Sequence, residues 1–373
     1  MATKNKKIGN VPNLRFPGFE GGWVNQSLGE ICKMQAGKFV SASEIYEFQD
    51  SSLYPCYGGN GLRGYTKSYN QDGKFSLIGR QGALCGNVTL ADGKFHATEH
   101  AVVVYPNDNL DTIWGYYLLN YLNLNKYATG MAQPGLSVQN LEKVATTIPN
   151  TKVEQRHIAK FLSLIDERIS TQNKIIEYLE TSIISFREKL LSQKLRFKDE
   201  YGNEFRDWEM KKLGEVALKK SSNISANKIE DNFGEFIIYG ASGILKHVDF
   251  YEEEQDYVSI IKDGAGVGRL LYCTGKSSVL GTMEIIRPKE TLNTYFLYCL
   301  LSNIDFAKYI SGSTIPHIYF KDYANELCDI PCFHEQIKIS NFLSAIDKKI
   351  EAEKKILIQY DSLKKYFLQN LFI

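Results

Sequence analysis

The chain has 373 residues, of which 43% are apolar and 23% are charged, and its formal net charge is +1 at pH 7. This composition is ordinary for folded domains, leaves room for two or three of them, and excludes a largely disordered chain. We expect neither a secretory signal nor a membrane span, because no apolar run follows the first lysines and no stretch of 18 apolar residues occurs.

Two further features of the composition indicate the compartment and the possible partners. The seven cysteines form no CxxC pair, as is typical of buried thiols in a reducing cytoplasm. Residues 13–150 carry 10 basic and 11 acidic side chains, and residues 195–332 carry 16 and 21. This acidic balance excludes a polybasic coat for nucleic acid. If the chain binds DNA, its basic surface must be local, or a partner must neutralise much of the phosphate charge.

An internal repeat organises the chain. Leu14-Arg15-Phe16 returns as Leu195-Arg196-Phe197, and Trp23 returns as Trp208. An offset of 182 then relates Tyr57-Gly58 to Tyr239-Gly240, Gly82 to Gly264, Gly86 to Gly268, and Pro134 to Pro316. Matches without a shift predict one fold that occurs twice. We therefore predict a tail over 1–12 and two similar globular domains over 13–150 and 195–332.

Each globular domain has mixed signals for strands and helices. Apolar runs over 75–78 and 102–105, and over 257–261 and 283–287, end at glycine or proline and predict strands. Segments 111–123 and 293–301 are rich in Tyr and Leu and predict helices. Segments 130–137 and 312–319 centre on a proline and predict exposed loops. The predicted fold class is α+β.

Long helices are predicted over 151–194 and 333–373. Their apolar residues alternate four and three apart, a heptad seam that needs a partner helix. The first seam has Gln172 as its polar position, and the second has Glu353 and a break at Lys364. We predict an antiparallel coiled coil and a pseudo-two-fold molecule, with the helices acting as a stiff spacer between the two domains. The seams are Ile158, Leu162, Ile165, Ile169, Ile176, Leu179, Ile183, Phe186 and Leu190, and Ile339, Leu343, Ile346, Ile350, Leu357, Tyr360, Phe367 and Leu371.

Signatures of catalysis and of cofactor or metal binding are weak. Gly275-Lys276-Ser277 resembles the end of a phosphate-binding loop, but Leu270 stands where its first glycine should be. Gly264, Gly266 and Gly268 do not have the spacing of a dinucleotide fingerprint. His96 and His100 could contribute to a metal site, or they could be ordinary surface or core histidines. Cys328 and Cys332 have no nearby histidine pair for zinc. No acid and base pair occurs in both copies.

The loops keep their glycines in both copies while their polar residues change. Such side chains can bond base edges in the major groove, and tyrosines can contact sugar and phosphate. The alternatives are that loop residues drift without constraint and that the tyrosines are half-buried core residues with hydrated hydroxyls. The residues predicted to contact DNA are Tyr57, Asn60, Arg63, Tyr65, Arg80, Gln81, Gln133 and Ser137 in the first copy, and Tyr239, Ser242, Lys246, Lys262, Asp263, Thr314 and His317 in the second.

With these motifs, the sequence closely resembles the specificity subunits of type I restriction and modification systems over nearly its whole length. The resemblance rests on Leu14-Arg15-Phe16-Pro17 with Trp23, on Ile148-Pro149 followed by Glu154-Gln155, and on FLSLIDERI over 161–169. The same pattern returns as Ile330-Pro331, Glu335-Gln336 and FLSAIDKKI over 342–350.

The resemblance implies that each globular domain recognises one half of a split sequence in double-stranded DNA. It implies a chain without activity of its own, on which two methyltransferase subunits and the restriction subunits assemble. S-adenosylmethionine, ATP and magnesium would be bound by those partners, and no cofactor by this chain. By position, the residues implied to bind the methyltransferases are Glu154, Gln155, Ile158, Glu335, Gln336 and Ile339; their alternative role is helix capping and seam packing.

Two other functions stay open at this point. One is a coiled-coil adaptor that binds proteins and no DNA. The other is an enzyme with an unrecognised site, which would show turnover without partners. If the chain is a DNA-recognition subunit, as the resemblance implies, we expect weak DNA binding by this chain alone and tight, salt-sensitive binding by the assembly.

Overall fold

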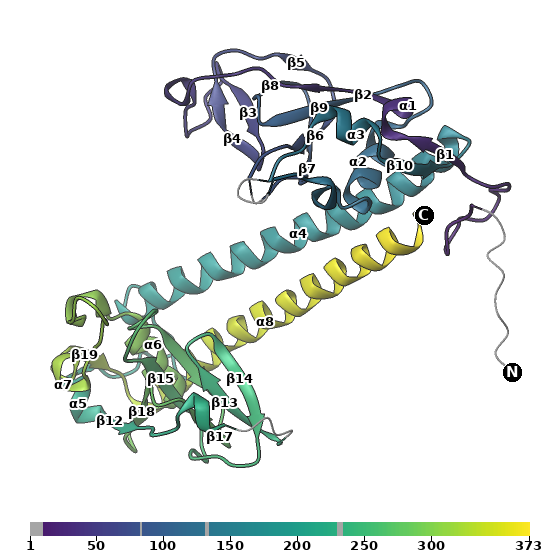
Figure 1. Ribbon diagram of the computed structural model, residues 1–373. Coiled ribbons are helices and arrows are strands. Elements are labelled where there is room, and N and C mark those ends of the chain that lie inside the picture. Colours follow the sequence, from purple (N-terminus) through teal and green to yellow (C-terminus); the bar gives the residue numbers. More distant parts are fainter. Residues whose placement is uncertain (1–9, 83, 131–133, 230–233) are drawn as a thin grey trace, which may run out of the picture. The chain divides into compact units, whose positions relative to one another are not determined.

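The computed structural model describes residues 10–82, 84–130, 134–229 and 234–373. The chain divides into two compact units, and each unit takes half of both long helices. The first unit ends at Asn173 and regains residues 355–373, and the second comprises Lys174–Lys354. The two long helices, α4 (Lys152–Leu191, teal) and α8 (Phe333–Asn370, yellow), therefore belong to both units (Figure 1).

The first unit contains two four-stranded sheets and a separate strand pair. One sheet is antiparallel, in the order β2-β9-β6-β7, and the other, β4-β3-β8-β5, has a parallel pairing between β3 and β8. The elements are β1 (Val24–Ser27), α1 (Leu28–Ile31), β2 (Cys32–Ala36), η1 (Ala42–Glu44), β3 (Tyr54–Gly58), β4 (Gly61–Thr66), β5 (Gln71–Asp72), β6 (Phe75–Gly79), β7 (Val88–Ala91), β8 (Lys94–Ala97), β9 (Ala101–Pro106), α2 (Thr112–Tyr121), η2 (Leu124–Tyr127), α3 (Val138–Glu142) and β10 (Ala145–Ile148).

The second unit repeats this topology. The sheet β12-β18-β15-β16 corresponds to β2-β9-β6-β7, and β14-β13-β17 corresponds to β4-β3-β8 with the same parallel pairing. The duplication and the mixed α/β class are therefore confirmed. The elements are β11 (Glu209–Lys212), α5 (Leu213–Val216), β12 (Ala217–Ser221), η3 (Ala226–Lys228), β13 (Phe236–Gly240), β14 (Gly243–Val248), β15 (Tyr257–Ile261), β16 (Leu270–Cys273), β17 (Ser277–Val279), β18 (Met283–Pro288), α6 (Thr294–Ser302), η4 (Phe306–Tyr309), α7 (Phe320–Tyr323) and β19 (Leu327–Ile330).

Helix α2 places the core of the first unit. It begins at Asp111, whose carboxylate accepts hydrogen bonds from the backbone N–H groups of Ile113 and Trp114, so two of the unpaired N-terminal donors are satisfied. Trp114 is fully buried and packs edge-on against Trp23. Asn293 caps α6 of the second unit, where its side-chain oxygen accepts one hydrogen bond, from the backbone N–H of Phe296. Both helices lie where the sequence predicted them.

The long helices run antiparallel within each unit. In the first unit, Phe161 of α4 packs against Phe367 of α8 at 4.7 Å between ring centroids, and Lys364 pairs with Asp166 at 2.6 Å. This pair explains the break in the heptad seam. In the second unit, Phe186 packs against Phe342 of the first turns of α8, at 5.2 Å. The packing of α4 against α8 agrees with the predicted antiparallel coiled coil.

Candidate functional site

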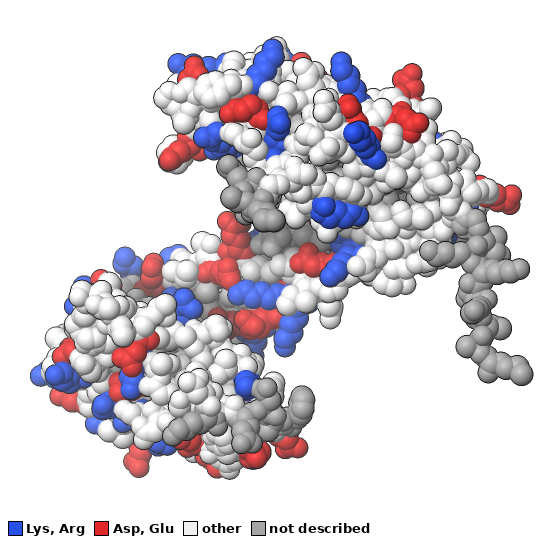
Figure 2. All heavy atoms as spheres, viewed as in Figure 1, with Lys and Arg blue, Asp and Glu red and all other residues white. Residues whose placement is uncertain are grey.

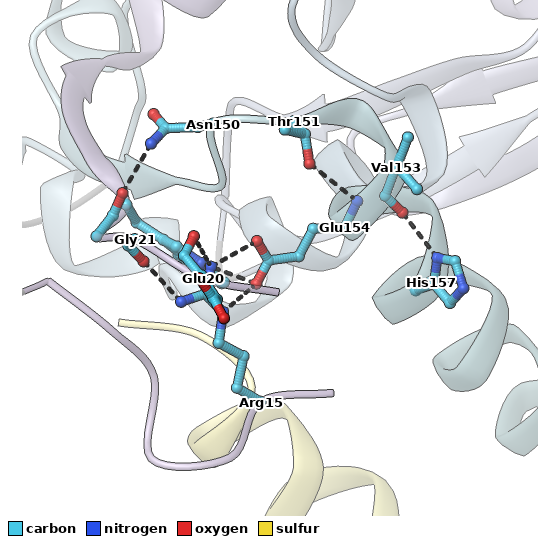
Figure 3. A network of polar contacts seen from close by, with 10 residues as sticks. Arg15, Glu20, Gly21, Asn150, Thr151, Val153, Glu154 and His157 are labelled. Atoms are coloured by element: carbon cyan, nitrogen blue, oxygen red, sulfur yellow. Dashed lines mark hydrogen bonds and ion pairs between the residues drawn. The ribbon is translucent and has the colours of Figure 1, made fainter. Parts of the chain in front are cut away.

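A buried polar cluster fixes the start of α4, and we name it the helix-start clamp (Figure 3). The Arg15 guanidinium donates from Nε to Glu154 Oε1 at 2.7 Å and from Nη2 to Oε2 at 2.9 Å. Trp23 Nε1 donates to Glu154 Oε1 at 3.1 Å. Glu154 is only 2% exposed, and its hydrogen bond raises the pKa of Arg15. The buried carboxylate thus forms a bidentate ion pair with the guanidinium. Such a partner is needed because burial of an unpaired charge is costly.

The same clamp occurs in the second unit. Arg196 donates from Nε and Nη2 to Glu335 at 3.1 and 2.9 Å, and Trp208 Nε1 donates to Glu335 at 3.0 Å. Glu335 is fully buried. The arginine and the tryptophan of the motifs that begin each repeat therefore share one role, which is to hold the glutamate at the start of the following long helix.

A glutamine beside each clamp glutamate ties the long helix to the short helix before it. Gln155 accepts from the backbone N–H of Asp111 at 2.7 Å and donates to the carbonyl of Asn109 at 3.0 Å. Gln336 does the same with Asn293, at 2.8 Å, and Thr291, at 3.1 Å. Each glutamine is buried, and its amide oxygen and amide nitrogen both have hydrogen-bond partners inside the unit.

These contacts bear on the six residues predicted to bind the methyltransferases. Glu154, Gln155, Ile158, Glu335, Gln336 and Ile339 are all at most 2% exposed. A direct docking contact needs accessible surface, which these side chains do not have. Their burial and internal hydrogen bonds support the alternative role, which is capping and seam packing. Their part in methyltransferase docking stays a prediction.

The aspartate of the repeated FLS motifs also has an internal partner that the sequence did not reveal. Tyr117 on α2 donates to Asp166 at 2.7 Å. In the second unit Tyr295 on α6 donates to Asp347. Burial is the largest cause that raises the pKa of Tyr117 and of Asp347. Each pair joins a long helix to the short helix of its unit.

Four segments of the first unit meet at one place, which we name the loop cluster: residues 58–61, 80–87, 98–100 and 134–137, with residue 83 outside the described part. The backbone of Arg80 donates to His100 at 3.0 Å and accepts from Leu136 at 2.8 Å. Gly82 donates to the carbonyl of Pro134 at 3.0 Å. Main-chain bonds thus hold predicted loops together that are over 50 residues apart.

A hollow of about 600 Å³ opens at this cluster, lined by Gly58–Arg63, Gln81, Gly82, Leu84 and His100. We name it the glycine hollow. Glycine is required here, because a Cβ at Gly79 would lie 2.0 Å from the Gly59 carbonyl oxygen as the turn crosses the end of β6. The backbone can therefore approach closely while Asn60, Arg63 and Gln81 stay exposed at the surface.

The other predicted DNA-contacting residues of the first unit lie in varied positions. Tyr57 packs edge-on against Phe95 under the sheet, and Tyr65 pairs through its backbone with Tyr46. The Arg80 Nε is buried, and no hydrogen-bond partner for it exists among the described residues. The Ser137 hydroxyl caps α3 by accepting from Asn140 at 3.1 Å. Gln133 lies outside the described residues.

The second unit has the equivalent loop cluster: residues 240–243, 262–269, 280–282 and 316–319. Gly264 donates to Pro316 at 2.9 Å, Ile318 donates to Lys262 at 3.0 Å, and Lys262 donates to Thr282 at 3.0 Å. The backbones of Asp263 and His317 pair in an isolated antiparallel β-bridge. Of the remaining predicted residues, Ser242 and Thr314 are exposed, Lys246 lies on β14, and Tyr239 is buried with its hydroxyl 3.1 Å from Thr274 Oγ1.

The metal-site alternative gains no support. His96 is buried, with Nε2 at 3.1 Å from the Lys38 carbonyl, while His100 pairs with Glu99. Over residues 10–82, 84–130, 134–229 and 234–373, no three His, Cys, Asp or Glu residues gather as metal ligands. In the same ranges no helix has the length and apolar character for crossing a bilayer. On the visible face of each unit, basic and acidic side chains are interspersed (Figure 2).

Sequence reasoning missed His100 and Leu84 as lining residues of the glycine hollow. His100 was considered only as a metal ligand. The available signal was its change to Thr282 in the other copy, the same kind of change that singled out Asn60 and Ser242.

Comparisons with known proteins agree with this architecture. A family model described as type I restriction modification DNA specificity domain matches residues 20–181 and again residues 206–360. The specificity subunit of the type I restriction enzyme EcoprrI from Escherichia coli is 48% identical over 142 residues, which are 38% of this chain and 35% of that protein. A protein from Mycoplasma genitalium named as a type I specificity subunit is 24% identical over 371 residues, 94% of each chain. The crystal structure of an S subunit of a type I restriction-modification system from M. genitalium has a similar fold, with a TM-score of 0.74, 21% identity, and coverage of 97% of this chain and 99% of that one.

Proposed function

The chain belongs to the family of type I restriction modification DNA specificity domains, and from this we propose that it is the DNA-recognition subunit of such a system. Each unit reads one half of a bipartite target through its loop cluster. The observation that carries this proposal is that both units build the cluster with the same main-chain bonds while its exposed side chains differ. A constant frame with variable polar groups is what two readers of different base sequences require.

The long helices would set the separation of the two half-sites and support the docking of two methyltransferase subunits. The helices carry exposed apolar side chains, among them Leu164 and Tyr178 on α4 and Ile358 and Tyr366 on α8. Apolar and aromatic area of this kind is enriched at the centres of protein interfaces. The clamps would act indirectly, by fixing where each helix begins. Restriction subunits would join the assembly.

On this proposal the chain supplies recognition and the partners supply chemistry. The methyltransferase subunits would bind S-adenosylmethionine and methylate adenine, and the restriction subunits would use ATP and magnesium. The mixed surface charge of both units supports shared phosphate contacts, because a chain with few surplus cations gains little from counterion release alone.

A domain exchange tests the reading role. Residues 13–150 are replaced by the same region of a relative with a known and different target, and modified adenines are sequenced in DNA methylated by the assembled complex. Half of the recognised motif should change and the other half should persist. The matched exchange of 195–332 should change the complementary half. An unchanged motif in both exchanges would favour the coiled-coil adaptor instead.

A binding titration tests the shared phosphate contacts. Gel-shift affinity for a target duplex is measured with this chain alone and with the methyltransferase subunits, over a series of salt concentrations. We expect weak binding by the chain alone and tight binding by the assembly, with a steeper loss as salt rises. Equal affinity with and without the methyltransferases would contradict this part of the proposal.

A further inference from the structure

A second hollow of about 250 Å³ adjoins the glycine hollow of the first unit, and Asn60 lines both. Four asparagines dominate its wall: Asn60, Asn87, Asn120 and Asn123. We name it the asparagine hollow. All four side chains are exposed. They come from three places in the chain, namely the β3–β4 turn, the connection before β7, and the end of α2.

The lining of this hollow suits a neutral ligand. Its residues include no Lys, Arg, Asp or Glu. Asn120 lies in the last turn of α2 and Asn123 follows that helix, where the helix dipole places partial negative charge. That field disfavours a phosphate group. A surface made of amides beside a helix C-terminus favours instead a ligand that both donates and accepts hydrogen bonds.

The hydrogen bonds inside the hollow leave one amide donor and one amide acceptor on two neighbouring side chains. Asn87 Nδ2 donates to Asn60 Oδ1 at 3.5 Å, and Asn120 Nδ2 donates to the Tyr116 carbonyl at 2.8 Å. Among the described residues, Asn60 Nδ2 and Asn87 Oδ1 have no side-chain partner and remain for a ligand. In the major groove, adenine presents a donor at N6 and an acceptor at N7, and asparagine is the side chain that matches this pair. Guanine presents two acceptors and would call for Arg or Lys.

The second unit keeps the frame and replaces the amides. With the offset of 182, α6 begins at the position that corresponds to the start of α2. The 3-10 helix η4 likewise spans the positions that correspond to η2. At the four asparagine positions the second unit has Ser242, Arg269, Ser302 and Asp305. Arg269 reaches the 240–243 turn, where its Nη1 donates to the Ala241 carbonyl at 3.4 Å. A place that holds its backbone and changes its hydrogen-bonding chemistry has the pattern of a base-reading position.

We propose that the asparagine hollow is a base-reading subsite of the first unit, and that it takes the major-groove edge of an adenine through N6 and N7. The inference rests on the proposed DNA-recognition function and names the chemistry of one position in the half-site. Asn87 and Asn60 contact the base, and Asn120 borders it. The second unit reads a different base at the equivalent place.

Removal of a single atom from the DNA tests the subsite. The motif of the wild-type assembly is first determined by sequencing modified adenines. Each adenine of the half-site read by the first unit is then replaced, one at a time, by 7-deazaadenine, which lacks the N7 acceptor. Binding of each duplex is measured for the full chain with its methyltransferase subunits, as wild type and as Asn60→Ala, which removes the amide nitrogen that would face N7. Asn109→Ala, an exposed asparagine before the other end of α2, is the matched control.

For the wild type, one replacement should weaken binding roughly 5- to 150-fold, the range for loss of a good base contact. The same replacement should cost Asn60→Ala less than about twofold, because the contact from Asn60 Nδ2 to N7 is already absent. Asn109→Ala should respond like the wild type. Equal losses for wild type and Asn60→Ala at every adenine, or a half-site without adenine, would overturn the subsite. Absence of any specific motif for the wild-type assembly would instead refute the proposed function itself.

Discussion

Truncation of Glu154 to alanine should destabilise the first unit and leave the second unit unchanged. The carboxylate is 2% exposed and accepts three hydrogen bonds from Arg15 and Trp23. Removal of one partner of a buried ion pair costs about 3–5 kcal/mol. The Arg15 side chain is 17% exposed and can regain some water, so the lower end of that range, about 3 kcal/mol, is expected. This corresponds to roughly a 100-fold shift in the opening equilibrium.

Native-state hydrogen exchange followed by mass spectrometry measures this effect separately in each unit. Peptides from residues 13–27 and from the first turns of α4 should exchange roughly 100-fold faster in Glu154→Ala. Peptides from 196–212, which hold the second clamp, should keep their rates. Lys74→Ala is the control, because it removes an exposed pair with Asp92 whose side chains are 44% and 64% exposed, worth under about 1 kcal/mol. The reasoning is refuted if Glu154→Ala changes exchange no more than Lys74→Ala does.

Three further substitutions probe other contacts. Gln336→Ala leaves the backbone of Asn293 without its buried partner and should lower the urea-unfolding free energy of the second unit by about 2 kcal/mol; a loss below about 0.5 kcal/mol would contradict this role. Gly86→Ala should destabilise the first unit far more than Gly82→Ala in thermal melts. Both glycines have positive φ, but only at Gly86 would a Cβ lie 2.4 Å from the Asn125 backbone nitrogen. Equal melting points of the two variants would refute the steric argument. Burial raises the pKa of Asp347 above 3.8, so the folded state holds this proton more tightly than the unfolded chain, and its contribution to stability falls as the pH rises above 3.8. The unfolding free energy of Asp347→Asn should therefore gain on that of the wild type between about pH 4 and pH 7, whereas a constant difference would exclude the effect.

Most of the fold could be predicted from the internal repeat and from the spacing of apolar residues. The heptad seams predicted both long helices, and runs ending in glycine or proline located the strands now seen as β6, β9, β15 and β18. These features follow from burial of an apolar face, which acts on short spacings that a sequence displays directly. The glycines shared by both copies indicated where the loops lie, because the backbone conformation of a glycine turn depends on residues close in sequence.

The polar contacts were less predictable, because they join residues distant in sequence. Arg15 and Glu154 were both recognised as motif residues, but no local pattern indicates that these two residues, whose numbers differ by 139, form one ion pair. The choice between docking and packing for Glu154 and Gln155 therefore stayed open, because their hydrogen-bond partners lie far from them in the sequence. Lys364 was interpreted as a break in the seam, whereas its partner Asp166 lies on the other helix. Long-range pairing depends on topology, which periodicity does not encode.

Residues 371–373 help to complete a core that is otherwise formed far earlier in the sequence. Leu371 and Phe372 are 3% exposed within the core of the first unit, where Phe372 stacks on Trp114 and Tyr121 at 5.3 and 5.4 Å between ring centroids. Deletion of residues 371–373 would therefore remove aromatic packing from a unit formed mainly by residues up to Asn173. A change more than 200 residues away from Trp114 in sequence would weaken the first unit directly.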